Sequence, residues 1–241
     1  MAVINVTTVE QFLTAYTQAV ASGDTEDVIE IMADIDFNSQ PLTTSYLSGG
    51  KKVINGNYHT LSNITTQNVV SQNLFRFSGS NYVTFNKVNF INMYRNEAYS
   101  FFYGTSSTNM HFIDCTFQGK GYRLAYYADF TRCAITWQNT QAISGSFNNT
   151  YMTYCWIHVD ITRASGNNYE FRELINSYVE GKIEGASGVT DGWHLCAALE
   201  NSVINIDSDL DYSAGLSGAG SISTVTVYNT DRMTGTITAQ S

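Results

Sequence analysis

The sequence predicts an all-β protein, a single-stranded right-handed parallel β-helix of about nine to ten coils with an N-terminal capping α-helix. A short phrase recurs about every 22 residues: a polar residue, a small or thiol residue, a free position, and an aliphatic or aromatic residue. Within each copy the pattern alternates with period two, which indicates a strand. Parallel strands joined in this way are right-handed by default. The copies lie at residues 87–90, 114–117, 132–135, 154–157, 176–179 and 201–204.

The composition is typical of a solenoid with a polar but weakly charged surface. Charged residues make up 14% of the chain, and a single proline leaves the hydrogen bonds of the strands intact. The net charge of −9 argues against a nucleic-acid partner, because phosphate binding needs clustered Lys and Arg. Neither a membrane-spanning run nor a secretory signal is recognisable, so we expect no membrane partner and synthesis in a cytoplasm.

Three cysteines occupy the same position in successive copies of the phrase, so we expect them to point inwards in one column of the core. Side chains in such a column run parallel about 4.8 Å apart instead of converging, which disfavours disulfides and metal binding. The acidic run at residues 207–211 lacks the Gly and the distal Glu of a calcium loop, so it is predicted to be a solvated corner. We therefore predict inert core thiols, no metal and no cofactor. If the period-two alternation continues before each thiol, the residue two places earlier also points inwards. The residues expected to point inwards are then Ile113, Cys115, Thr131, Cys133, Thr153 and Cys155.

The first part of the chain, residues 1–24, is predicted to be a capping segment, and residues 25–241 are predicted to form the β-helix domain. Thr7 and Glu10 have the spacing of a capping box at the start of a helix. The apolar residues that follow recur at helical spacing. Because a solenoid has an open core at each end, this helix is expected to cover the first coil. Its apolar face consists of Phe12, Leu13, Tyr16, Ala19 and Val20.

Outward positions on two adjacent coils contain the candidate binding site. If the phrase sets the register, an exposed Trp and an exposed Tyr lie next to each other, with charged residues beside them. Aromatic faces stack on sugar rings, while carboxylates and amides form hydrogen bonds with hydroxyl groups. This pattern predicts a surface that binds a glycan or a partner. The residues are Trp156, His158, Asp160, Tyr178, Glu180 and Lys182.

Other interpretations of this surface remain open. Trp156 and Tyr178 could be covered by a loop or a neighbouring subunit, with Asp160 and Lys182 as an ordinary surface ion pair. We favour this interpretation over glycan binding. Carboxylates on neighbouring coils would lie roughly 8 Å apart, within the spacing of inverting glycosidases, but catalysis is the least favoured of the three and no catalytic residue is assigned.

The N-terminal residues resemble a known family. The opening helix, the segment Asp34-Ile35-Asp36-Phe37 and the stretch at residues 54–64, Ile-Asn-Gly-Asn-Tyr-His-Thr-Leu-Ser-Asn-Ile, look like the first coils of the pectate-lyase-like superfamily of right-handed parallel β-helices. Asn55 and Tyr58 depart from the pattern that is usual there. The resemblance covers about residues 5–64 by motif and the remainder by repeat rhythm, and it implies fold rather than activity.

The motifs of the enzymes in this superfamily are missing. Pectate lyases carry Arg-x-Pro-x-x-Arg, but the one proline here, Pro41, has no arginine beside it. Polygalacturonase-like hydrolases carry Asn-Thr-Asp, Asp-Asp and Gly-His-Gly on successive coils. Here Asn-Thr-Asp occurs at residues 229–231 without its companions, so we expect a chance match.

Together these observations favour a structural or adhesive protein of a bacteriophage particle, resembling tail-spike-type β-helix proteins. It would belong to the tail, baseplate or head surface and would act on the virion outside the host cell. We expect a homotrimer, because proteins of this kind associate side by side, along with contacts to other phage proteins and to host surface polysaccharide. The alternative is a small polysaccharide-degrading lyase or glycoside hydrolase. A surface adhesin encoded by the host is the third candidate.

Overall fold

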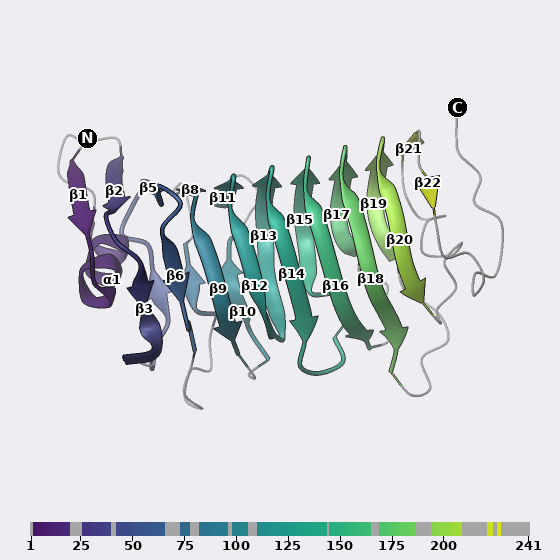
Figure 1. The fold of residues 1–241 in the computed structure, drawn as a ribbon, viewed down its shortest axis with the longest axis horizontal. Coiled ribbons are helices and arrows are strands. Elements are labelled where there is room, and N and C mark those ends of the chain that lie inside the picture. The colour runs from purple at the N-terminus through teal and green to yellow at the C-terminus, as the bar shows by residue number, and fades with distance from the viewer. Residues whose placement is uncertain are drawn as a thin grey trace.

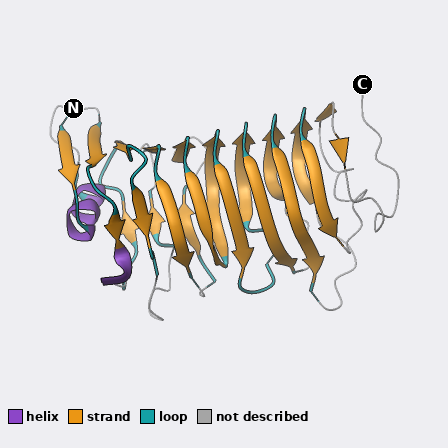
Figure 2. Ribbon diagram, viewed as in Figure 1, coloured by secondary structure: helices purple, strands orange, loops and turns teal. Residues whose placement is uncertain are grey.

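The chain forms a parallel β-solenoid with one short α-helix at its N-terminal end, which confirms the predicted fold class (Figure 1). A computed structural model describes residues 2–19, 26–39, 42–65, 73–77, 82–95, 98–105, 110–143, 145–164, 169–186, 194–208, 221–223 and 226–227. Within these residues the strands form two parallel sheets of 13 and nine strands, here called sheet 1 and sheet 2. Figure 2 shows the helix at one end of the row of strands.

Most coils contribute one main strand to each sheet. Sheet 1 contains β1 (Val3–Val6), β2 (Asp27–Ile31), β4 (Tyr46–Leu47), β5 (Lys52–Asn55), β7 (Phe75–Arg76), β8 (Val83–Asn86), β10 (Ser100–Tyr103), β11 (Met110–Ile113), β13 (Arg123–Thr131), β15 (Phe147–Thr153), β17 (Tyr169–Ile175), β19 (His194–Glu200) and β21 (Ser221–Ser223). Sheet 2 contains β3 (Ile35–Asp36), β6 (Thr60–Ser62), β9 (Asn89–Tyr94), β12 (Thr116–Gly121), β14 (Ala134–Asn139), β16 (Trp156–Arg163), β18 (Tyr178–Gly185), β20 (Val203–Ser208) and β22 (Thr226–Val227). A short 3₁₀ helix, η1 (Phe37–Ser39), follows β3.

The described part of the chain makes about seven turns, fewer than the nine to ten that the repeat spacing predicts. At the two ends of sheet 2, the strands β3 and β22 are only two residues long.

The polar residue that opens each copy of the phrase forms a corner between sheet 1 and sheet 2. Its backbone is in the left-handed region, which bends the chain sharply between the two strands. The corner residues are Lys87 (φ 54°), Asp114 (φ 54°), Arg132 (φ 54°), Tyr154 (φ 56°), Asn176 (φ 49°) and Asn201 (φ 44°).

These corners correct one sequence-based expectation. Ile113, Thr131 and Thr153 are only partly buried, whereas Phe112 and Phe130, one residue earlier in their strands, are fully buried. The left-handed corner interrupts the period-two alternation, so the inward phase of sheet 1 is shifted by one residue relative to that of sheet 2. The prediction that Ile113, Thr131 and Thr153 point inwards is therefore wrong.

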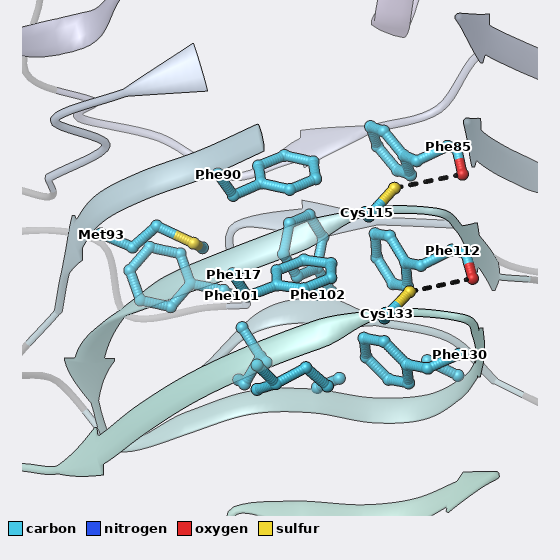
Figure 3. Close-up of a cluster of buried hydrophobic side chains, with 14 of the residues drawn as sticks. Phe85, Phe90, Met93, Phe101, Phe102, Phe112, Cys115, Phe117, Phe130 and Cys133 are labelled. Atoms are coloured by element: carbon cyan, nitrogen blue, oxygen red, sulfur yellow. Dashed lines mark hydrogen bonds between the residues drawn. The ribbon is translucent and has the colours of Figure 1, made fainter. Parts of the chain in front are cut away.

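The cysteine column is confirmed as part of the core. Cys115, Cys133 and Cys155 are buried and carry free thiols, as does Cys196. Each thiol of the column donates to a carbonyl oxygen of the preceding coil, at 3.4 Å from Sγ in all three cases. Figure 3 shows two of these bonds, to the carbonyl groups of Phe85 and Phe112.

Stacked aromatic rings fill the space beside the thiols (Figure 3). The ring of Phe112 stacks between those of Phe85 and Phe130, with centroids 5.1 Å and 4.8 Å away. The rings of Phe90 and Phe117, on neighbouring strands of sheet 2, are also stacked, with centroids 4.9 Å apart. Like side chains on successive coils thus pack directly on one another, which gives a continuous core along the solenoid.

The N-terminal helix α1 (Val9–Thr17) covers the first coil, as predicted. Phe12 and Tyr16 are buried, and the ring of Phe12 packs edge-on against Phe37 and Phe75, at 6.0 Å and 6.3 Å. Leu13 is partly buried against the same core. The sequence did not predict β1, which precedes the helix and pairs in parallel with β2.

The ends of this helix differ from the expectation. The N-cap is Thr8 rather than Thr7, and its side chain accepts a hydrogen bond from the backbone N–H of Gln11. The Gln11 side chain in turn accepts from the backbone N–H of Thr7, so the capping interactions are shifted by one residue. Because the helix ends at Thr17, Ala19 is exposed beyond it, and Val20 lies outside the described residues.

Candidate functional site

The outward face of sheet 2 brings the six predicted site residues together. In the register between β16 and β18, Trp156 lies opposite Tyr178, His158 opposite Glu180, and Asp160 opposite Lys182. Exposed or partly buried residues alternate with buried ones along β16, so its three site residues share one face. This alternation arises because successive side chains of a strand point to opposite faces.

An aromatic platform begins this face. The side chain of Trp156 is 43% exposed, and its ring stacks on the imidazole of His158, with centroids 6.2 Å apart and planes inclined by 25°. Tyr178, on the next coil, is partly buried, and its hydroxyl accepts a hydrogen bond of 3.1 Å from the Asn205 side chain. The neighbouring coil therefore holds Tyr178 in place, whereas Trp156 remains accessible.

The charged residues of the site are engaged with neighbours. The imidazole Nδ1 of His158 lies 3.2 Å from Oε1 of Glu180, and Asp160 accepts a hydrogen bond of 3.1 Å from the Gln138 side chain. Lys182 pairs with Glu184 on its own strand, at 2.6 Å, and this contact raises the pKa of the lysine. Asp160 adds only a weaker attraction to Lys182, so the closest ion pair of that lysine runs along the strand and not across the coils.

A groove of about 500 Å³ adjoins these residues and extends over three coils towards the N-terminus. Paired outward side chains of successive strands line it. From β9 to β16 they are Asn92 and Tyr94, Gln118 and Lys120, Thr136 and Gln138, and His158 and Asp160. The lining residues of β12 and β14 pair in register with His158 and Asp160, and the sequence did not identify them as part of the site.

A β-bulge shapes the N-terminal end of this groove. Phe90 lies opposite Phe117 and Met93 opposite Gly119, so β9 has one residue more than β12 between these pairs. Asn92, inside the bulge, has φ 54°. A bulge redirects the side chains that follow it, and here Tyr94 comes to lie opposite Lys120. The Lys120 ammonium lies 5.4 Å from the centre of the Tyr94 ring.

Gly119 allows the bulged strand to approach closely. A Cβ atom added at this glycine would lie 2.5 Å from the carbonyl oxygen of Met93, which no side chain tolerates. The bulge in β9 therefore depends on the glycine in β12. Because the bulge changes the phase of β9, strict alternation along this strand could not have predicted the position of Tyr94 on the outward face.

The described residues contain no group of three or more His, Cys, Asp or Glu side chains that could hold a metal ion. Nδ1 of His59 lies 3.3 Å from a carboxylate oxygen of Asp34, and Nδ1 of His111 lies 3.3 Å from one of Asp129. The two histidines lie on separate coils. Residues 209–211 and 229–231, which include the rest of the acidic run and the Asn-Thr-Asp triplet, lie outside the described residues. No helix in the described part of the chain is long and apolar enough to cross a membrane.

Comparison with known proteins gives no match to any family model, curated protein or solved structure. The site combines accessible aromatic faces with amide, hydroxyl and carboxylate groups along one strip of sheet 2.

Proposed function

We propose that this chain is a structural or adhesive protein of a bacteriophage particle, in the tail, the baseplate or the head surface, that contacts a host surface glycan. The observation that carries the glycan contact is the accessible ring of Trp156, stacked on His158 beside Asp160 and Glu180. Sugars need such a combination, because their C–H faces stack on aromatic rings while their hydroxyl groups form directed hydrogen bonds.

The particle assignment is supported by the scaffold together with the composition. A rod of stacked coils with few charges and many tyrosines is suited to an exposed, rigid surface protein. Of the enzyme motifs of the pectate-lyase-like superfamily, to which we propose that the chain is related, the sequence contains Asn-Thr-Asp alone, without the companions that it needs. The proposed site of action is the virion outside the host cell.

A parallel homotrimer is part of the proposal, with subunits that meet along one face of the solenoid. Large exposed aromatic side chains are frequent at the centres of such interfaces. Trp156 opens β16, which lies near the middle of the row of strands in sheet 2 (Figure 1), where a side-by-side contact would bury the most area. The same residue therefore marks either the subunit contact or the glycan contact.

Substitution of one residue distinguishes these two roles. If Trp156 lies in the interface, Trp156→Ala costs on the order of 2 kcal/mol or more of association free energy and shifts the protein towards monomer in light scattering. If it lies in a glycan site, the mass is unchanged and binding to a polysaccharide array is lost. Tyr154→Asn is the matched control, because it removes a large exposed ring at a corner outside this face. A Trp156→Ala protein with unaltered mass and binding contradicts both roles.

A small polysaccharide-degrading enzyme is the second candidate, supported by Asp160 and Glu180. These carboxylates are diagonal neighbours on adjacent strands, about 7–8 Å apart by strand geometry, within the range of inverting glycosidases. An assay for new reducing ends and for unsaturated products tests this activity. Product formation that disappears in both Asp160→Asn and Glu180→Gln supports the enzyme, and its absence in the wild-type protein supports the adhesive role.

A further inference from the structure

We propose that the binding site extends along the solenoid axis into the groove over β9, β12 and β14, and that it accepts an uncharged oligosaccharide with Tyr94 and Trp156 as its two stacking platforms. This inference rests on the proposed glycan-binding function. It adds residues outside the predicted site and specifies the chemical class of the ligand.

The dimensions of the groove fit a short sugar chain. The strands β9, β12, β14 and β16 are consecutive neighbours in sheet 2, so the groove spans three inter-strand steps, or about 14 Å. Each step is close to the length of one pyranose ring in an extended chain. A volume of about 500 Å³ is that of a ligand site, and the open groove leaves both ends of the chain free to continue.

The floor of the groove carries neutral hydrogen-bonding groups in register. Gln118 lies opposite Thr136 on the next strand, and Gln138 lies two residues further along that strand, opposite Lys120. Amide and hydroxyl groups both donate and accept hydrogen bonds, as the hydroxyl groups of a sugar do. Such a row of alternating donors and acceptors can follow a repeating polymer without a charged partner.

The charges around the groove disfavour an anionic ligand. Asp160 lines one end, and Glu180 and Asp207 follow on the next two coils of the same face. Among the described residues that line the groove, Lys120 carries the one ammonium group. This group lies over the ring of Tyr94, which covers one side of it. With a net charge of −9 on the chain, the overall field of the protein would also repel a uronate or phosphate polymer.

The two aromatic rings lie at opposite ends of this surface. Tyr94 is 38% exposed on β9, and the bulge at Asn92 places it opposite Lys120. Trp156 stands beside His158 at the β16 end. Tyr94 lies in the column of Asp160, four residues further along the strand direction than Trp156, so a chain between the two rings would cross the face diagonally over about 20 Å. Such a chain would stack at both termini, form hydrogen bonds in the middle and need about four sugar rings.

The test uses the full-length protein and a panel of uncharged polymers (dextran, mannan and xyloglucan) and anionic polymers (polygalacturonate and alginate). We expect binding to an uncharged polymer that persists at high salt, because no ion pair contributes to it. With oligosaccharides cut from the bound polymer, we expect affinity to rise with length and to level off at about three or four rings. Exclusive binding to the anionic polymers overturns the inference.

Variants separate this inference from the function on which it rests. Tyr94→Ala and Gln118→Ala are each expected to weaken binding about five- to tenfold, while Tyr94→Phe restores most of the affinity. Tyr154→Asn should leave binding unchanged, and thermal melting of each variant checks that the fold is retained. If Trp156→Ala abolishes binding but Tyr94→Ala and Gln118→Ala do not alter it, the groove is excluded and the glycan function stands. If the wild-type protein binds no polymer of the panel, both fail.

Discussion

Asp114 and Arg132 occupy the same corner of adjacent coils and form a two-pronged ion pair. Nε of Arg132 lies 2.6 Å from Oδ1 of Asp114, and Nη2 lies 2.9 Å from Oδ2. Both residues have φ 54°, so the pair joins two consecutive left-handed corners of the solenoid. The guanidinium group holds the pKa of Asp114 below its usual value, chiefly through this hydrogen bonding.

The first prediction concerns the pH dependence of this corner pair. Because the pKa of Asp114 is lower in the folded state than in the unfolded chain, the pair contributes stability above a pH of about 4 and loses it as the pH falls through the folded-state pKa. Asp114→Asn should therefore reduce stability slightly near neutral pH and leave it unchanged in strong acid. Asn suits this test because it tolerates the left-handed conformation. Urea unfolding of both proteins at several pH values measures the difference, and a constant difference at every pH would contradict the assignment.

The second prediction concerns the backbone cost of a corner. Tyr154 adopts φ 56° with its side chain 61% exposed, whereas the equivalent corners further along the chain are Asn176 and Asn201. Replacement by Asn should stabilise the protein by roughly 0.5–1 kcal/mol, because Asn enters the left-handed region more readily than Tyr. Tyr154→Ala, which removes the ring but keeps most of the backbone cost, is the control. Denaturant midpoints compare the three proteins, and equal midpoints for Asn and Ala would show that the corner carries no strain that Asn relieves.

These corners also explain how far the fold follows from the sequence. The repeating phrase predicts the strands of sheet 2 from β12 to β20 correctly, because alternation continues from the thiol position onwards, whereas in β9 the bulge interrupts it. It fails for sheet 1, because the corner residues Arg132 and Tyr154 are left-handed although their residue types give no signal for that conformation. At Asn176 and Asn201 the residue type is a recognisable signal for such a conformation.

The same reasoning applies to the candidate site. Trp156, His158 and Asp160 lie on one regular strand, so a register taken from the phrase places them and their partners on β18 correctly. Tyr94 could not be found in this way, because the bulge at Asn92 inserts a residue and changes the phase of β9. Asn92, within β9, is the local signal for the bulge, and it becomes informative only with the neighbouring strand in view.

The third prediction concerns the thiol column. Cys115, Cys133, Cys155 and Cys196 are all buried, and burial raises the pKa of Cys133 and raises that of Cys196 to about 12. Since the thiolate is the reactive form, labelling of the native protein should be slow and should become fast only in denaturant. Mass spectrometry after timed labelling gives the number of modified residues. Rapid modification of all four thiols in the native protein would be incompatible with this core.

The last prediction concerns the helix at the N-terminal end. Phe12 is fully buried against Phe37 and Phe75, so Phe12→Ala should cost about 3–5 kcal/mol of unfolding free energy through the cavity that it leaves. Thr14→Ala, on the exposed side of the same helix, should cost far less and serves as the control. Deletion of residues 1–22 removes both the helix and β1, which exposes the core of the first coil and the edge of β2. Open sheet edges and apolar surface promote association, so the truncated protein should aggregate. A truncated chain with the solubility, mass and melting temperature of the full-length protein would show that α1 is not required to close the solenoid.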